Sequence, residues 1–218
     1  MLLLLPSLLA LLPLAGVASP LSSVRANKRG TNLSSETQNG LLDGSPCAPI
    51  TLIWARGTNE IGNVGLRTGP SFFKAVADII GPKNLAVHGV TYPAGKLGFL
   101  SGGSAEGSRN MAELAELAAK QCPETKIVLS GYSQGAQLVH RAAKLLSAAT
   151  ATRISSVVVF GDPYHPAAIP GIPDWKVATF CRKGDNICEG GMRIGQAHRE
   201  YPQDAPAAAE FVVKQSGL

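Results

Sequence analysis

The sequence predicts an α/β fold, a three-layer α/β/α sandwich with a central, mainly parallel sheet of five strands. Short apolar segments rich in β-branched residues alternate along the chain with longer segments of helical periodicity. Strands that alternate with helices need crossover connections, and such crossovers give parallel sheets covered by helices on both faces. The chain has 218 residues, of which 45% are hydrophobic, which suits one sizeable core and is too little for two ordinary domains.

The hydrophobic pattern predicts four helices and five strands at the following positions. The helical segments are 69–80, 104–121, 135–149 and a last one near 206–215. The expected strands are 50–55 (ITLIWA), 85–92 (LAVHGVTY), 126–131 (KIVLSG), 154–161 (ISSVVVFG) and 176–181 (KVATFC). In an open parallel sheet, ligands bind at the carboxyl ends of the strands. The residues that follow each strand are therefore the candidates for function.

The N-terminal 44 residues differ in composition from the rest. Residues 1–18 form a leucine-rich run broken by Pro6 and Pro13, which is typical of a secretory signal peptide and too short for an anchor helix, although no Lys or Arg precedes it. Residues 19–44 are rich in Ser, Asn and Gly, and are expected to be a propeptide or a disordered segment outside the fold. The folded domain is then 45–218, and the protein is expected to be extracellular, without stable membrane insertion.

The positive charge of the chain is concentrated near the N-terminus. Arg25, Lys28 and Arg29 account for three of the five net charges, and residues 1–29 contain no acid, so the remainder carries +2. The Lys28–Arg29 pair is either a dibasic processing site or part of a solvated linker. No basic stripe with interleaved aromatic residues occurs in the remainder, so we do not expect a nucleic-acid partner.

Four cysteines, an even number in a chain with a secretory signal, favour two disulfides over free thiols or a metal site. Their sequence positions allow three pairings. Cys181 and Cys188 bracket a short loop, and Cys47 and Cys122 each flank a predicted core element, so we favour Cys47–Cys122 and Cys181–Cys188. The spacing matches no usual zinc pattern, so we expect no metal.

A G-x-S-x-G motif, GYSQG, stands between a predicted strand and a predicted helix. In a sharp strand-to-helix turn the central residue takes a strained conformation, and the glycines at 131 and 135 relieve crowding against the neighbouring strand and helix. The turn raises the hydroxyl of Ser133 above the sheet and directs the first amides of the helix, beginning with that of Gln134, toward whatever the serine attacks. The motif therefore predicts an exposed nucleophile.

A nucleophilic serine needs a histidine base and an acid that orients it. His88 lies in a predicted strand and His140 on a predicted helix, so both are expected to be packing or surface residues. Two acid–base pairs then follow the serine in chain order. Asp162 and His165 are three residues apart in one proline-bounded loop, GDPYHP, which would have to turn back on itself.

The second pair, Asp185 and His198, comes from two separate segments. The acid lies in a loop that a Cys181–Cys188 disulfide would stiffen, and the histidine stands just before the last helix. Because each residue can be positioned independently, we favour this pair.

Four segments, in this order, resemble those of fungal cutinases, in the cutinase and acetylxylan-esterase family of serine esterases: ARGTNEIGNVG (55–65), GYSQGA (131–136), FCRKGDNIC (180–188) and AHREY (197–201). The resemblance covers about residues 46–216. It implies a lidless α/β-hydrolase-like cutinase fold, with the serine open to solvent and to insoluble polyesters. It also implies Ser133 as nucleophile, Asp185 as orienting acid, His198 as base, and an oxyanion hole from Gln134 and Thr58. No cofactor is implied, and we expect a monomer.

Cutinases hold acyl chains with apolar loops beside the site. The matching positions here are expected to be Leu97, Phe99, Leu100, Met192 and Ile194. The second of these loops also carries Arg193, Gln196 and Arg199, which makes it polar for a long aliphatic substrate. The expected function is therefore hydrolysis of cutin-like polyesters and of short- to medium-chain esters, with two alternatives: deacetylation of xylan by the same residues, and a non-catalytic secreted binding protein.

Overall fold

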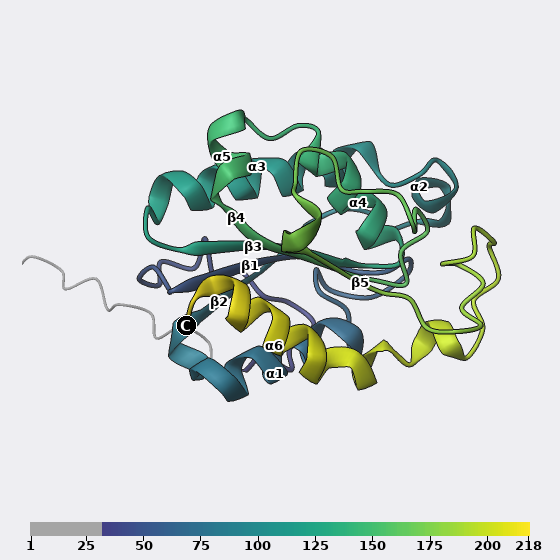
Figure 1. Cartoon of the computed structure of the whole chain (residues 1–218), viewed down its shortest axis with the longest axis horizontal. Coiled ribbons are helices and arrows are strands. Elements are labelled where there is room, and N and C mark those ends of the chain that lie inside the picture. Colours follow the sequence, from purple (N-terminus) through teal and green to yellow (C-terminus); the bar gives the residue numbers. More distant parts are fainter. Residues whose placement is uncertain (1–31) are drawn as a thin grey trace, which may run out of the picture.

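The computed structural model describes residues 32–218, and the predicted signal peptide and the Lys28–Arg29 pair lie outside this range. A single five-stranded sheet, with strand order β2-β1-β3-β4-β5, crosses the middle of the molecule (Figure 1). All four strand pairs are parallel. The strands are β1 (Ile50–Ala55), β2 (Leu85–Gly89), β3 (Lys126–Tyr132), β4 (Ile154–Phe160) and β5 (Val177–Phe180).

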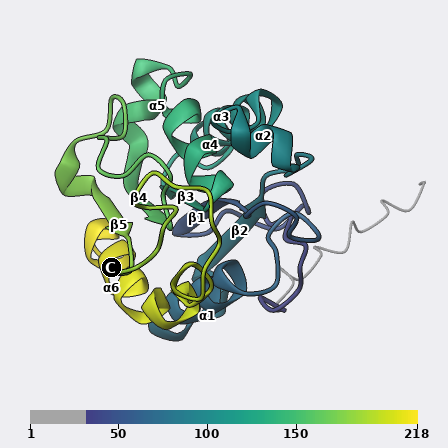
Figure 2. The same ribbon diagram turned by 90° about the vertical axis from the view of Figure 1, so that its right-hand side faces the viewer.

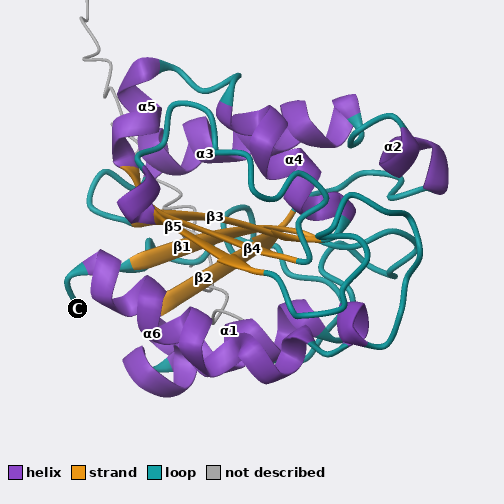
Figure 3. Cartoon of the chain, turned by 45° about the vertical axis from the view of Figure 1, so that its right-hand side comes forward, coloured by secondary structure: helices purple, strands orange, loops and turns teal. Residues whose placement is uncertain are grey.

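Helices cover both faces of this sheet, so the predicted α/β/α sandwich is confirmed (Figure 3). On one side lie α1 (Thr68–Ile80) and α6 (Ala205–Ser216); on the other lie α2 (Lys96–Leu100), α3 (Ala105–Gln121), α4 (Gln134–Ala143) and α5 (Ala148–Arg153). The short 3₁₀ turns are η1 (Pro82–Asn84), η2 (Asp174–Lys176), η3 (Ala197–Arg199) and η4 (Tyr201–Asp204). Within residues 32–218 no helix combines the length and apolarity needed to cross a bilayer.

The central strands are buried on both faces, which is why they appear in the sequence as continuous apolar runs. All six residues of β1 are buried, and successive side chains point to opposite layers. Ile53 packs into the core beneath α3 and α4, whereas Trp54 packs with Phe72 and Phe73 of α1 on the other side. The Trp54 and Phe73 rings meet edge to face, with centroids 5.4 Å apart.

The helix expected over 135–149 is interrupted, and this prediction is wrong in its second half. The first helix, α4, ends at Ala143, and α5 begins at Ala148. The side chain of Ser147 caps α5 by accepting from the amide of Thr150, and its own amide donates to Glu116 of α3. A serine at the N-cap satisfies a free amide in the first turn of a helix, and such free amides occur only where a helix begins. Ser147 therefore favours the start of a second helix here.

Residues 32–44 do not lie outside the fold, which corrects the expectation from their composition. The amide of Gly40 donates to Val87 O at 2.8 Å, and that of Gly89 donates to Gln38 O at 2.9 Å. The side chain of Asn63 adds bonds to Gln38, Asn39 and Gly89. The physical reason is that β2 is an edge strand whose outer N–H and C=O groups need partners. This segment supplies them.

The carboxyl ends of the five parallel strands lie at one edge of the sheet, where the loops that follow them gather (Figure 2). The loop after β1 carries Thr58, the turn after β3 carries Ser133, and the loop after β5 carries Asp185. His198 returns to the same edge in η3, ahead of α6. The fold thus brings residues that are distant in the sequence to one place.

Candidate active site

Ser133 occupies the strained turn that its motif predicts. Its φ of 57° is positive, a conformation that non-glycine residues rarely adopt. A Cβ atom on Gly131 would lie 2.3 Å from Gly135 O, and one on Gly135 would lie 1.9 Å from Ala55 O. Only glycine fits at either position, because β3 and α4 approach each other and β1 this closely.

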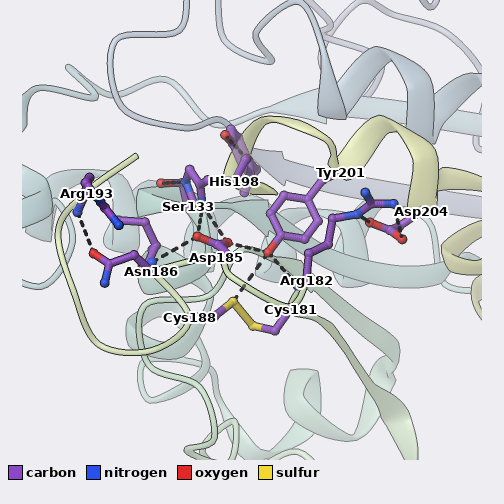
Figure 4. A network of polar contacts seen from close by, with 12 residues as sticks. Ser133, Cys181, Arg182, Asp185, Asn186, Cys188, Arg193, His198, Tyr201 and Asp204 are labelled. Atoms are coloured by element: carbon purple, nitrogen blue, oxygen red, sulfur yellow. Dashed lines mark hydrogen bonds and ion pairs between the residues drawn. A yellow bond between two sulfur atoms is a disulfide. The ribbon is translucent and has the colours of Figure 1, made fainter. Parts of the chain in front are cut away.

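Ser133, His198 and Asp185 form a continuous hydrogen-bonded line (Figure 4). His198 Nε2 lies 2.9 Å from Ser133 Oγ, and His198 Nδ1 donates to Asp185 Oδ2 at 2.8 Å and Oδ1 at 3.0 Å. All three side chains are nearly buried, and Ser133 is only 2% exposed. Ser133 is thus less exposed than the absence of a lid implied: its hydroxyl contacts His198 Nε2, and its amide donates to Phe160 O.

Tyr201 is a fourth member of this line, and no role was expected for it from the sequence. Its fully buried hydroxyl donates to Asp185 Oδ2 at 2.5 Å. Burial, with the adjacent carboxylate as a further cause, raises the pKa of Tyr201, so the hydroxyl stays protonated and keeps its role as donor. The amide of Ile187 donates to the other oxygen, Asp185 Oδ1, at 3.0 Å. Asp185 thus accepts from three directions, which fixes the carboxylate plane.

The loop that carries Asp185 is closed by the expected disulfide between Cys181 and Cys188, with Cα atoms 5.8 Å apart. Beside it, the guanidinium of Arg182 is paired with Asp204 at 2.7 Å and Glu200 at 3.3 Å, and the Arg182 amide donates to Tyr201 OH. The second expected disulfide, Cys47–Cys122, ties the segment before β1 to the end of α3. The acid therefore lies in a cross-linked loop anchored to η4.

A second tyrosine holds the histidine from its other side. Tyr132 OH donates to the carbonyl oxygen of His198 at 2.8 Å, and the two rings lie with centroids 5.1 Å apart at 30°. This tyrosine is the second residue of the G-x-S-x-G motif, so the turn that presents the serine also positions its partner. Gly161 leaves room for the imidazole ring of His198, since a Cβ at position 161 would lie 2.7 Å from His198 Cε1.

The environment of His198 keeps the imidazole neutral. Burial lowers the pKa of His198 below its usual value, and the hydrogen bond and charge of Asp185 offset this only in part. A neutral imidazole whose Nδ1 proton is committed to Asp185 has a free lone pair on Nε2. That lone pair faces Ser133 Oγ and can accept its proton.

Thr58 and Gln134 meet beside the serine, as an oxyanion hole requires. Gln134 Nε2 donates to Thr58 Oγ1 at 2.9 Å and to Gly95 O at 3.0 Å. Because Thr58 Oγ1 accepts this bond, its own hydroxyl proton remains available to another acceptor. The amide of Gln134 is the first of α4 and has no partner within the helix. The two residues expected to form the oxyanion hole, next to Ser133 in the turn and on the loop after β1, are thus in direct contact.

The loop that carries Thr58 is held by buried polar contacts. Arg56 Nε donates to Glu60 O at 2.7 Å, and Arg56 also donates to Tyr92 O at 2.9 Å. The amide of Gly57 donates to the Glu60 carboxylate at 2.7 Å. Burial raises the pKa of Glu60, against the lowering effect of this hydrogen bond and of Arg56. These contacts fix the backbone on both sides of Thr58.

The alternative pair, Asp162 and His165, does not assemble. Asp162 Oδ2 lies 2.8 Å from Nε2 of His140, and its Oδ1 accepts from the amide of Tyr164 at 2.9 Å. His165 is exposed. Asp162 therefore ties the turn after β4 to α4. The partner of this acid, His140, is 5% exposed, and no local pattern in the sequence links the two residues.

The five residues expected to contact acyl chains lie on α2 and in the loop that follows Cys188. Leu97 is 81% exposed and Met192 70%, and Leu100 and Ile194 are also exposed, whereas Phe99 is half-buried. Ile194 lines a pocket of about 380 Å³ together with Thr58, Tyr132 and Arg199. Apolar side chains thus project from two segments near the serine, and the pocket beside Thr58 is partly polar.

Comparisons with known proteins agree with this fold and identify the family. The cutinase family model matches residues 46–216. A cutinase of Botryotinia fuckeliana is 46% identical over 179 residues, which cover 82% of this chain and 89% of the relative. A cutinase of Monilinia fructicola is 41% identical over 209 residues, covering 96% and 94%.

Among solved structures, a Trichoderma reesei cutinase in complex with a phosphonate inhibitor matches with a TM-score of 0.78 and 45% identity over 84% of this chain and 81% of that one. An acetylxylan esterase matches with a TM-score of 0.66 at 21% identity, over 79% of this chain and all of that one, which shows a shared fold alone. The match to the family model and the identity to whole-length relatives decide the family. The chain belongs to the cutinase family of serine esterases.

Proposed function

We propose that this protein acts outside the cell, as a monomer, on cutin-like polyesters and on short- to medium-chain acyl esters, with Ser133 as its nucleophile. The observation that carries the proposal is the unbroken line from Ser133 Oγ through His198 to Asp185, at 2.9 and 2.8 Å. Every residue of that line comes from this one chain, which supports action as a monomer.

The first half-reaction acylates the serine. Ser133 Oγ attacks the ester carbonyl carbon while His198 Nε2 takes the hydroxyl proton, and Asp185 stabilises the imidazolium that forms. The carbonyl oxygen becomes an oxyanion, which accepts from the amides of Gln134 and Thr58 and from the Thr58 hydroxyl. When the C–O bond breaks, the imidazolium returns the proton to the leaving alcohol, and the acyl group stays on Ser133.

The second half-reaction restores the free enzyme. Water takes the place of the alcohol, and His198 accepts one of its protons as the oxygen attacks the acyl carbon. The same oxyanion donors stabilise the second tetrahedral intermediate. Its collapse releases the carboxylic acid and returns the proton to Ser133 Oγ, so water is the only co-reactant.

The proposal that the protein is secreted rests on two features. Residues 1–18 have the composition of a signal peptide, and the two disulfides suit an oxidising compartment. Removal of residues 1–18 would leave residues 32–44 to complete the edge of β2. N-terminal sequencing of the protein from culture medium tests this, and a protein that stays in the cells or keeps residues 1–18 would contradict it.

The substrate class follows from the side chains beside the serine. Leu97, Leu100 and Met192 project from α2 and the facing loop, and such exposed apolar groups suit acyl chains or the surface of an insoluble polyester. We expect higher kcat/KM for p-nitrophenyl butyrate than for the acetate, and release of hydroxy fatty acids from cutin. Preference for acetate together with release of acetate from acetylated xylan would instead favour the deacetylase alternative.

The nucleophile itself is tested by Ser133→Ala. The folded variant should lose turnover, and an organophosphate should label wild-type Ser133 stoichiometrically. His165→Ala is the matched control, since that histidine is exposed and outside the line, and it should keep activity and labelling. Appreciable turnover by folded Ser133→Ala would refute the assignment, and unlabelled wild-type protein would revive the non-catalytic alternative.

A further inference from the structure

A sizeable cavity lies outside the catalytic line. It measures about 630 Å³ and opens between α3, α4 and the loop after β4. None of Ser133, Asp185, His198, Thr58 and Gln134 lines it. His140, at its floor, is seven residues beyond Ser133, about 10 Å along the chain at the helical rise. A ligand here would leave the active site free.

The charge on this groove has one sign. Arg109 of α3, Arg141 of α4 and Lys144, which follows α4, line it, and no Asp or Glu is among its lining residues. Within residues 32–218 no carboxylate forms an ion pair with any of these three cations. Three cations without acidic partners around a concave surface favour an anionic ligand.

The walls of the groove are fixed in place before any ligand binds. Tyr164 OH donates to Gly102 O at 2.7 Å, and the Tyr164 ring meets the His140 ring edge to face at 5.1 Å. His140 is in turn held by buried Asp162 at 2.8 Å. Between these polar anchors the surface is made of small apolar groups, including Ala167 and Ala168. A rigid aromatic side chain beside small apolar groups suits the apolar faces of sugar rings.

The cations are spread along the groove instead of converging on one point. A guanidinium nitrogen of Arg141 lies 3.5 Å from Ser101 O, at the α2 end, whereas Lys144 is three residues further along the chain, and Arg109 is on the opposite helix. Arg141 and Lys144 thus follow one another at the end of α4, and Arg109 lies on a different helix. Carboxylates carried along an acidic sugar chain can engage cations at separate points of the groove, whereas a single phosphate would engage fewer of them.

We propose that this groove binds a short stretch of an anionic polysaccharide, a chain of uronic acid residues, through Arg109, Arg141 and Lys144. A cavity of 630 Å³ lies within the range of roughly 300–1,000 Å³ typical of ligand sites and would hold about two or three sugar residues. The groove would anchor the esterase on an acidic wall polymer while the catalytic edge remains free to act on esters.

The test is retention of the purified enzyme on immobilised polygalacturonate, with fully methyl-esterified polymer as the matched ligand. Wild-type protein should be retained at low salt, released by about 0.5 M NaCl because salt screens exposed charges, and not retained on the esterified polymer. The variant Arg109→Gln/Arg141→Gln/Lys144→Gln should bind at least tenfold more weakly. Its kcat/KM for p-nitrophenyl butyrate should stay within about twofold of wild type.

The control variant removes the same charge from the other face, as Lys74→Gln/Lys83→Gln/Lys214→Gln on α1, η1 and α6. It should keep at least half of the wild-type affinity. Equal losses in the two triple variants would mean that net charge alone drives retention, and absence of wild-type retention at low salt would also overturn the proposal. If the wild type bound phosphatidylglycerol vesicles as tightly as polygalacturonate, and the groove variant lost that binding too, the assignment to a polysaccharide would be overturned.

Discussion

Tyr201→Phe removes one oxygen from the buried line and leaves the ring in place. In the wild type this hydroxyl donates to Asp185 Oδ2, the same oxygen that accepts from His198 Nδ1. A hydrogen bond to a charged acceptor contributes about 1.5–3 kcal/mol, so its loss corresponds to roughly 10- to 100-fold if all of it is expressed in the transition state. Because Ile187 N and His198 still hold the carboxylate, we expect kcat to fall by only about tenfold. KM should stay within about twofold of the wild-type value.

The variant also changes the pH profile, which a purely structural role would not do. Without the tyrosine donor, Asp185 carries more of its negative charge toward His198 and stabilises the imidazolium better. The pKa of His198, lowered by burial in the wild type, should rise, so the acidic limb of kcat/KM should move to higher pH.

The measurement is kcat/KM for p-nitrophenyl butyrate over about pH 4–9. Tyr164→Phe is the matched control, because it also loses a hydrogen-bonded tyrosine hydroxyl, but that hydroxyl donates to Gly102 O and lies away from Asp185, so its acidic limb should match that of the wild type. An unshifted acidic limb and unchanged kcat in folded Tyr201→Phe would refute the coupling.

Three further predictions follow from the geometry. Asp185→Asn favours the wrong imidazole tautomer, a change that costs about 10⁴ in kcat in a comparable triad, and Asp162→Asn should cost at least a hundredfold less; the reverse order in folded variants would move the acid to the other loop. Thr58→Val keeps the amide and removes the hydroxyl, so kcat should fall by at most about 10²–10³, and an unchanged kcat would exclude that hydroxyl as a donor. Cys181→Ser with Cys188→Ser should lower kcat at temperatures where circular dichroism still reports a folded protein, since the small ring acts mainly on the position of Asp185; full activity would contradict this.

Hydrophobic periodicity was enough to predict the layers and the succession of strands and helices along the chain, but not the order of the strands within the sheet. Each central strand is buried on both faces, so its apolar run is long and unmistakable, as in β1. The turn at Ser133 was predictable for a similarly local reason, because Gly131 and Gly135 are required by contacts within a few residues and with one neighbouring strand. The choice of Asp185 and His198 needed the rule that loops at the carboxyl ends of parallel strands share an edge, together with the argument that two separate segments position the acid and the base independently.

The features that the sequence did not predict depend on contacts between residues that are distant in the sequence. Residues 32–44 have the composition of a linker, yet they pair with β2 because that strand is at the edge of the sheet, a fact of strand order and not of local pattern. The break between α4 and α5 depends on Glu116, some thirty residues earlier, which accepts from Ser147. Tyr201 resembles any buried aromatic residue in the sequence, and its role appears only once Asp185 is placed beside it.

The two buried Asp–His pairs show why a dyad alone does not identify a catalytic centre. Asp162 lies as close to His140 as Asp185 does to His198, 2.8 Å in each case, and all four residues are almost fully buried. The two pairs differ in what lies next to the second ring nitrogen of the histidine. His198 Nε2 faces Ser133 Oγ, whereas the Asp162–His140 pair joins α4 to the turn after β4 and helps to form the wall of the cationic groove. The same chemical pair can therefore orient a base in one place and stiffen a surface in another, and the contact beyond the pair determines which role it has.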